Sequence, residues 1–499
     1  MKKLISIMSV LLTLILLLSS CDVLFPTTTT VQSCVVHQWS DYKHNEHVHW
    51  REYTCGCPWP EIVEEHVDID EDLVCDICGA GIKPPSIYNE SVVSLAGEKM
   101  NVSYNDSIDK GYLAFLAKLD IFAAKLSAKA YERFGEGKNV SFSPISVYMA
   151  LALVCESADN ETRQEVLNAI GVTYEEVNTY TKYLYAFCNQ EHYVWNEENE
   201  RELSGYGLLT NSIWLDDTVP FKNAGIDKLS KEYNCDVFQT DFGTDLAKEE
   251  IKSYINDKTR GLIDGNLPLD PETAFVLLNT FYLKDAWNDF GEDLDFTKEE
   301  YSFTNSDGST AEKSFLMGYY QPGRAQSFDE YSVYYAETTN GYRLHFILPN
   351  GENAVDDVFT QANIENVLSI SDWRAYEGDT VCHITRAIFP EFEAKFDESL
   401  KEMMLEDFDI ITLFDETACD MSNVTDTSVF CSDMVHKSKL KIDKTGIEGA
   451  AVTAMIMAGE SADPHIYEYH DFVVDKAFGF VLTDRYGTVL FSGVVNAID

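Results

Sequence analysis

Cysteine and histidine side chains gather in residues 34–79 at spacings that suit a metal ion. The ligand pairs are Cys34-x-x-His37, Cys55-x-Cys57 and Cys75-x-x-Cys78, with His66 between the last two pairs. Thiolate and imidazole suit zinc, and a bound ion could replace the hydrophobic core that so short a segment lacks. Disulfides are an alternative, natural outside the cytoplasm, although five cysteines leave one unpaired. A mostly disordered stalk is the third interpretation.

No arrangement of residues predicts an enzyme. The sequence contains no G-x-S-x-G elbow, no H-E-x-x-H pair and no G-x-x-x-x-G-K-[ST] loop. Serines and histidines are present, but no local pattern joins a nucleophile to a base. We therefore expect a protein that is not itself a catalyst.

The start of the chain predicts an export signal that ends in a lipid-attachment cysteine. Two lysines follow Met1, and the apolar run from Leu4 to about Leu18 is shorter than the ~20 residues of a membrane span. Leu18-Ser19-Ser20-Cys21 resembles a bacterial lipobox, in which Cys21 receives the lipid; a plain signal peptide with a chance cysteine is the alternative. Acyl chains contribute about 0.8 kcal/mol per buried CH₂, so several would hold a protein firmly. We expect a bacterial, extracellular lipoprotein anchored to the membrane at the cell surface.

The chain of 499 residues is strongly acidic, with 84 Asp and Glu residues against 37 Lys and Arg residues and a net charge of −47. Such a surface repels nucleic acids and heparin-like polyanions, so we expect neither as a partner or activator. Because 45% of the residues are hydrophobic, the chain can bury a large core.

The composition changes along the chain and predicts five regions. They are a signal peptide with its lipobox (1–20), a Thr-rich tether (21–33), a small Cys/His-rich module (34–80), a linker (81–110) and one globular domain (111–499). The linker is polar and contains two adjacent prolines, which favour an extended connection.

Within the globular domain, helices are expected mainly in the first half and strands in the second. Apolar residues recur at helical spacing over 114–134, and Pro144 opens a second helix that runs through Val154. Ser143 and Ser146 flank that proline and can cap the free N–H groups. Buried strands are expected at 275–284, 343–350, 480–484 and 488–495. This order predicts an α+β domain with a large sheet.

Five motifs of this domain resemble the serpin family, in the order and at the spacings of that family. They are NVSFSPISVYMALALV (139–154), INDKTRGLI (255–263), LNTFYLKDAW (278–287), HKSKLKID (436–443) followed by Gly446, and DKAFGFVLTDRYGTVLFSGVVN (475–496). The resemblance covers nearly all of 111–499. It implies a serpin fold of three β-sheets, about eight or nine helices and an exposed reactive-centre loop. It also implies that Trp287 is the tryptophan of the breach.

The candidate hinge of the reactive loop begins at Gly446. Strand side chains alternate, so one face would carry Ile447, Gly449, Ala451, Thr453, Met455 and Met457, and the other Glu448, Ala450, Val452, Ala454 and Ile456. The first face has no charge and is small in the middle, as a strand that slides onto a packed core requires. Inhibitory serpins usually have a small residue where Ile447 stands and alanine where Gly449 stands. The bulk of Ile447 could therefore slow insertion.

The bond that a target protease would cleave is found by counting along the loop. About fourteen residues on from Gly446, as is usual in the family, the bond is Glu460–Ser461, which would suit a glutamyl-specific protease. The stretch from Gly446 to Phe478 is longer than usual by several residues. Met457–Ala458, or a bond nearby, is therefore a rival.

Ser143, Ser146, Asn279 and His436 match the family's shutter, a buried polar cluster beneath the main sheet. Buried polar groups must be hydrogen-bonded, and such a network can have a closed and an opened arrangement. A satisfied core network without a switching role is the alternative.

These features predict a suicide inhibitor of a serine-type or cysteine-type endopeptidase that acts by reactive-loop cleavage and insertion. The expected partner is a target serine protease, held in a covalent acyl complex by a monomeric inhibitor. The domain needs no cofactor, whereas the 34–80 module has a candidate structural zinc. The alternative is a non-inhibitory binding or cell-surface adhesion protein on the same scaffold, because a fold does not dictate a function.

Overall fold

The computed structural model describes the second part of the chain almost continuously and the first part only in short pieces. The described residues are 43–44, 48–51, 62–65, 92–95, 109–195, 201–263, 265–267, 273, 275–287, 295–371, 373, 376–377, 381–447 and 466–498. The chain divides into two compact units, Met1–Asn89 and Glu90–Asp499. In the first unit, the described residues form an antiparallel sheet in the order β1 (Lys43–His44), β2 (Val48–Arg51) and β3 (Ile62–Glu65).

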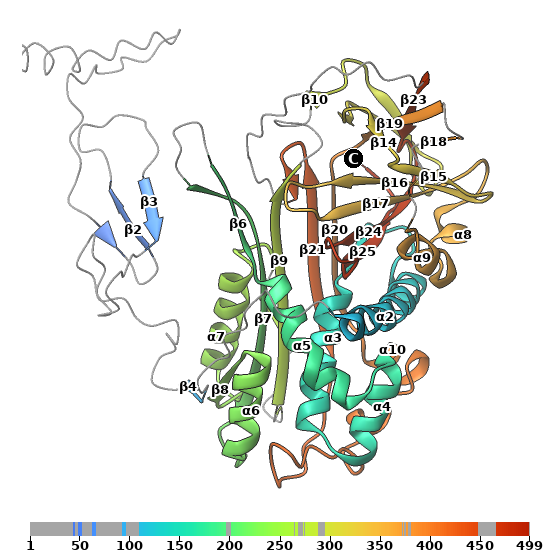
Figure 1. Ribbon diagram of the computed structural model, residues 1–499. Helices are drawn as coiled ribbons and strands as arrows, with labels where there is room; N and C mark the ends of the chain where they lie inside the picture. Colours follow the sequence, from blue (N-terminus) through green and yellow to red (C-terminus); the bar gives the residue numbers. More distant parts are fainter. Residues whose placement is uncertain are drawn as a thin grey trace, which may run out of the picture. The chain divides into compact units, whose positions relative to one another are not determined.

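Helices fill much of the first half of the second unit, as predicted (Figure 1). The described part of this unit contains nine α-helices and one 3₁₀ turn: α2 (Lys110–Phe134), α3 (Pro144–Ser157), α4 (Asn160–Ile170), α5 (Tyr174–Cys188), α6 (Asn223–Tyr233), α7 (Asp245–Lys258), α8 (Val355–Val358), α9 (Gln361–Leu368), α10 (Lys401–Asp407) and η2 (Thr412–Phe414). The helix α2 matches the periodic stretch 114–134 but begins earlier. It does so because the Asp109 carboxylate caps it, accepting from the backbone N–H of Tyr112 at 2.8 Å.

The largest sheet, called here the main sheet, is mixed and has eight strands. Its order is β20 (Phe392–Ser399), β21 (Val435–Asp443), β22 (Gly446–Ile447), β9 (Phe275–Ala286), β7 (Arg201–Asp216), β8 (Cys235–Thr240) and β4 (Val93–Ser94), with β6 (Glu191–Trp195) also paired to β7. The strands β7 and β8 are parallel, whereas β7 and β9 form a long antiparallel ladder. The helix α6 packs on β8, and α7 packs on β9 (Figure 1).

Two further six-stranded sheets and a two-stranded ribbon complete the described part of the second unit. One has the order β15 (Ala325–Ser327), β16 (Tyr331–Glu337), β17 (Arg343–Pro349), β24 (Phe478–Thr483), β25 (Val489–Val495) and β5 (Val140–Phe142). The other contains β10 (Asp295–Phe296), β13 (Leu316–Met317), β19 (Val381–Phe389) and β14 (Gln321–Pro322), and both β18 (Tyr376–Glu377) and β23 (Ile466–Val473) pair with β19. A separate ribbon joins β11 (Tyr301–Thr304) to β12 (Thr310–Lys313). Apart from this two-stranded ribbon, the prediction of three sheets and eight or nine helices is therefore confirmed for the described residues.

The helix α3 lies at the centre of the core. It contacts β9 of the main sheet and β25 of the second sheet, and all its residues except Ala150 are buried. A helix that is apolar on every side belongs in such a position, because it has no face to offer to water. Its burial places the start of α3 directly beneath the strands that carry the candidate site.

The strand predictions agree with the structure within a few residues. The stretches 275–284, 343–350, 480–484 and 488–495 correspond to β9, β17, β24 and β25. Other strands were not predicted, among them the long β7 and the short β4, which falls inside the stretch 81–110 that the sequence indicates as a linker. There Val93 and Ser94 pair with Gln239 and Phe238 of β8 and add to the edge of the main sheet.

Candidate functional site

The main sheet holds a two-residue strand, β22, between β21 and β9. Gly446 and Ile447 pair with Asp443 and Ile442 of β21 on one side, and with Ala286 and Asp285 of β9 on the other. Both pairings are antiparallel, so β9 and β21 run parallel to each other on either side of β22. The first two residues of the predicted hinge thus lie inside the main sheet.

Gly446 occupies a place that only glycine fits. Its φ is +147°, in the region that L-residues with a side chain rarely adopt. A Cβ built there would lie 2.1 Å from the carbonyl oxygen of Asp285, because the backbone of β9 passes directly beside it. The glycine therefore lets the chain turn from β21 into the sheet at close contact with β9.

Ile447 points into the hydrophobic core, where its side chain has no exposed surface. Its partner Ile442 is also buried, so both residues lie on the inner face of the sheet. Ile447 thus lies on the inner face of the sheet, and the orientation of the later hinge residues stays a prediction. The effect of this bulky side chain on the rate of insertion stays a prediction, although the sheet accommodates the side chain itself.

Trp287, the predicted breach tryptophan, holds the turn between β21 and β22. Its indole Nε1–H donates to the carbonyl of Asp443 at 2.9 Å, and its backbone N–H points to the carbonyl of Thr445 at 3.4 Å. The ring is buried and meets the ring of Phe389 edge-on, with 5.9 Å between the centroids. Trp287 therefore ties β9 to the start of the hinge.

A buried carboxylate lies beside this position. Asp285 accepts hydrogen bonds from the side-chain amide of Asn340 at 2.7 Å, the backbone N–H of Asn340 at 3.2 Å and the backbone N–H of Ala286 at 3.1 Å. Burial raises the pKa of Asp285 to about 6, against the opposing effect of these hydrogen bonds. The sequence analysis missed this residue, since an aspartate in a strand motif gives no sign of its burial.

Three of the four predicted shutter residues form one hydrogen-bonded cluster beneath β21. The backbone N–H of Ser143 donates to Nε2 of His436 at 3.1 Å, and the hydroxyl of Ser143 donates to the carbonyl of Leu490 at 3.0 Å. The Ser143 oxygen also lies 3.0 Å from Oγ of Ser146. Ser143 occupies the N-cap position of α3, but its side chain does not cap the helix because the hydroxyl bonds to Leu490 instead. The expectation of side-chain capping by Ser143 was therefore wrong.

The imidazole of His436 is neutral in this cluster. Its Nε2 accepts a hydrogen bond from the backbone N–H of Ser143, and burial lowers the pKa of the imidazole to about 4. A positive charge is therefore unfavourable at this point of the sheet.

A neighbouring contact attaches β21 to β5, because the hydroxyl of Ser438 donates a hydrogen bond to the backbone carbonyl of Ser141.

Asn279, the fourth predicted shutter residue, bonds to β7 rather than to the other three. Its side-chain amide donates to Oδ1 of Asn211 at 2.6 Å and to the carbonyl of Thr210 at 3.2 Å. Its own Oδ1 is buried without a hydrogen-bond partner in the described structure. Asn279 and His436 both line a cavity of about 100 Å³ between α3, β9 and β21. The structure thus leaves an unused acceptor and free space between the two strands.

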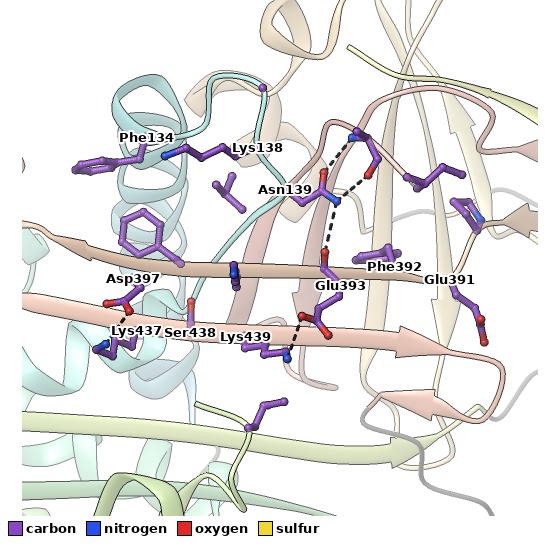
Figure 2. A pocket seen from close by; sticks show the side chains of 18 of the residues that line it. Phe134, Lys138, Asn139, Glu391, Phe392, Glu393, Asp397, Lys437, Ser438 and Lys439 are labelled. Carbon is purple, nitrogen blue, oxygen red and sulfur yellow. Dashed lines mark hydrogen bonds and ion pairs between the residues drawn. The ribbon is translucent and has the colours of Figure 1, made fainter. Parts of the chain in front are cut away.

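A broad surface pocket of about 1050 Å³ lies over β20 and β21 (Figure 2). Two of its lysines are paired with acidic neighbours: Lys437 lies 2.7 Å from Asp397, and Lys439 lies 3.0 Å from Glu393. Figure 2 shows these pairs running across the two strands. These two pairs therefore reinforce the contact between β20 and β21. The expected lack of a heparin-like activator stays a prediction.

Several predicted site residues lie outside the described residues. They are the reactive bond Glu460–Ser461, the hinge residues Glu448, Gly449, Ala450, Ala451, Val452 and Thr453, the lipidation residue Cys21, and the candidate metal ligands Cys34, His37, Cys55, Cys57, Cys75 and Cys78. Their roles stay predictions. Among the described residues, no helix is long and apolar enough to cross a membrane.

Comparison with known proteins agrees with this arrangement. The family profile described as Serpin (serine protease inhibitor) matches residues 117–498. The chain is 28% identical to Iripin-3 of Ixodes ricinus over 72% of this chain and 89% of that protein. It is 27% identical to Serpin-ZXA of Oryza sativa subsp. japonica over 75% of this chain and 94% of that protein. The solved native structure of the thermophilic serpin Tengpin resembles it with a TM-score of 0.64 and 20% identity, covering 80% of this chain and 98% of Tengpin.

The fold and the site thus define a protein whose main sheet holds the two-residue strand β22 between β21 and β9. The chain belongs to the serpin family. Members of this family are in general protease inhibitors rather than catalysts, and their partner is the target protease that they inhibit.

Proposed function

We propose that the protein inhibits a serine-type or cysteine-type endopeptidase as a suicide substrate. The observation that carries the proposal is the place of β22, where the start of the reactive loop is already paired on both sides within the main sheet. A cleaved loop can continue from β22 as a full strand. Strand addition of this kind is the established behaviour of serpins.

The register of β22 fixes where each further residue of the loop would lie. Continuing both ladders places Thr453 opposite His436 of β21 and opposite Asn279 of β9. In that inserted strand Thr453 would lie on the inner face, because strand side chains alternate and Ile447 points inward. The loop therefore brings a small hydroxyl to the two shutter residues.

The site offers that hydroxyl a partner and space. Oδ1 of Asn279 is a buried acceptor without a partner in the described structure, and the cavity beside it measures about 100 Å³. A satisfied buried acceptor is worth about 1–3 kcal/mol relative to an unsatisfied one. Insertion would also extend the two antiparallel ladders that β22 already forms with β21 and β9, and so would satisfy further backbone groups of both strands. Each of these terms drives insertion once the loop is cut.

The chemistry of inhibition belongs to the target. The nucleophile of the protease attacks the carbonyl carbon of the scissile bond and forms an ester or thioester with the N-terminal part of the loop. The peptide C–N bond breaks, and the C-terminal fragment leaves with a new amino terminus. Insertion then carries the acylated protease along the sheet and distorts its active site before water can attack the ester or thioester. We propose Glu460–Ser461 as the scissile bond, with Met457–Ala458 as the rival, so the expected target prefers glutamate.

We also propose that the protein acts outside the cytoplasm, held at the cell surface by a lipid on Cys21. The support is the position of the lipobox directly after the apolar run. The 34–80 module would then lie between anchor and inhibitor, with zinc or disulfides as its cross-links.

Incubation of the purified chain with a panel of proteases tests the inhibitory function. The panel should contain glutamyl-specific, elastase-like and subtilisin-like enzymes, together with one papain-like cysteine protease. We expect a complex with one of them that survives denaturing electrophoresis, and a released C-terminal fragment that begins at Ser461. Cleavage of the folded chain by all of them without such a complex would favour the non-inhibitory alternative.

A further inference from the structure

Two histidines and a glutamate meet at the surface of the sheet that contains β19 and β23. Nδ1 of His383 lies 3.2 Å from Nε2 of His470 and 3.6 Å from Oε2 of Glu468, and Nε2 of His470 lies 3.9 Å from the same oxygen. All three potential ligand atoms fall within 4.8 Å of one another. They come from two strands whose residues are far apart in the sequence.

The strand register holds this arrangement in place. His383 is the direct cross-strand partner of Glu468 in the parallel ladder between β19 and β23. Glu468 and His470 are two residues apart on β23, so their side chains leave the strand on the same face. The cluster is therefore built from backbone pairing and not from a chance contact of mobile loops.

The distances suit a tetrahedral metal ion. Zinc binds imidazole nitrogen at about 2.0–2.1 Å and carboxylate oxygen at about 2.0–2.2 Å, so two ligands of one tetrahedral ion lie roughly 3.4 Å apart. The three measured separations bracket this value. Two imidazoles and one carboxylate are also a ligand set that proteins use for zinc, with the fourth position left to water.

The charges around the cluster favour a cation as well. Arg386 lies three residues beyond His383, on the other face of β19, where Asp471 binds it through two hydrogen bonds of 2.7 and 3.0 Å. Its charge is thus neutralised away from the cluster. The net charge of −47 adds a long-range attraction for cations.

We infer that His383, Glu468 and His470 bind a divalent transition-metal ion, most suitably Zn²⁺, which cross-links β23 to β19. The strand β23 begins directly after the segment 448–465, and β19 is its partner in the described sheet. Most of its residues are exposed, so backbone bonds and side-chain pairs hold it more than core packing does. A bound ion therefore fastens the strand that follows the reactive loop. This inference does not depend on inhibition.

The test must separate this site from the cysteine-rich segment 34–80, which has its own candidate zinc ligands. Hydrogen–deuterium exchange on the full chain does so, because peptides that cover 466–473 report β23 alone. We expect Zn²⁺ to slow exchange there at least about tenfold, and the double variant His383→Ala/His470→Ala to show no such effect. Tyr469→Ala, an exposed neighbour on the other face of β23, is the matched control and should respond as the wild type does.

Metal analysis of the dialysed proteins gives a second readout. The double variant should bind one equivalent of Zn²⁺ less than the wild type, and Glu468→Gln, which keeps the shape of the side chain, should weaken zinc binding at least about tenfold. Equal zinc stoichiometry in the wild type and both variants would overturn the inference. Unchanged exchange of β23 in zinc-loaded wild type would overturn it too, leaving a hydrogen bond between two histidines.

Discussion

The substitution Thr453→Arg should turn the proposed inhibitor into a substrate. If the two ladders of β22 were continued, residue 453 would point inward between His436 and Asn279, where the cavity of about 100 Å³ has room for a small side chain. Arginine would bring a positive charge to the position where insertion must pass. The target protease would still cut the loop, but the loop could not continue past this point.

The structure supplies the magnitude. Burial lowers the pKa of His436 from 6.5 to about 4, so a positive charge on that side chain is about 3 kcal/mol less favourable there than in water. A guanidinium beside it meets the same surroundings. Because each 1.36 kcal/mol is a factor of ten in rate, insertion should slow by about 100-fold.

The assay is the stoichiometry of inhibition, the number of inhibitor molecules consumed for each protease molecule inactivated. Slower insertion gives water time to hydrolyse the acyl bond, so this number should rise steeply for Thr453→Arg while the rate of loop cleavage stays the same. Val452→Arg is the matched control, since residue 452 of an inserted loop would face away from the core, so this substitution should change the stoichiometry little. Equal effects of the two substitutions would refute the register and the inward face derived from it.

Three other outcomes follow from the described contacts. His436→Ala leaves the backbone N–H of Ser143 without its acceptor, which costs about 1–3 kcal/mol of stability. We expect a lower unfolding midpoint in thermal scans, and faster spontaneous insertion or polymerisation on native electrophoresis. An unchanged midpoint together with unchanged inhibition would argue against a shutter. The pKa of His436 is about 4 in the folded chain and 6.5 in the unfolded chain, so the unfolded chain binds more protons between these two pH values. The contribution of His436 to stability is therefore fully present above about pH 6.5 and is lost as the pH falls toward 4. In denaturant unfolding at pH 7 and pH 4.5, His436→Gln should lose less stability at the lower pH than the wild type does. The opposite effect of Asp285, with its pKa of about 6, is the same in both proteins and does not change this difference. An equal loss of stability in the two proteins would contradict the lowered pKa of His436. Cys21→Ala should move the protein from the membrane fraction to the soluble fraction, and membrane retention of this variant would exclude the lipid anchor.

Much of the fold can be predicted from the sequence where a long, regular pattern decides the structure. The helix over 114–134 and the apolar strands at 275–284 and 488–495 are such cases, because an apolar repeat or run covers most of the length of each. The start of α2 and the strand β4 are different. The helix begins where Asp109 caps it, and two residues of β4 have no periodicity to detect, so only pairing with β8 defines them.

The candidate site shows the same division. Ser143, Ser146 and His436 come together as the family resemblance implies, since the start of α3 lies beneath β21. The partner of Asn279 could not be predicted, because Asn211 meets it only through the register of β7 and β9. Long-range register is absent from any local sequence pattern.

The histidine and glutamate cluster is another product of register. His383 is separated from Glu468 by more than eighty residues, and only the parallel ladder between β19 and β23 makes them neighbours. A sequence search for metal ligands therefore favours the closely spaced cysteines of 34–79 and passes over this surface. Pairing across strands, rather than spacing along the chain, is what would reveal it.

The most direct test of the central claim is to follow the cleaved loop in a single reaction with a glutamyl-specific protease. Denaturing electrophoresis and mass spectrometry of the products identify both the complex and the cut. The loop-insertion account predicts a covalent complex of the protease with the N-terminal part of the chain, and a free C-terminal fragment that begins at Ser461. A stable complex with a different first residue would move the scissile bond but keep the mechanism. Complete cleavage of the loop by a protease that stays fully active, with no complex formed, would contradict inhibition by insertion.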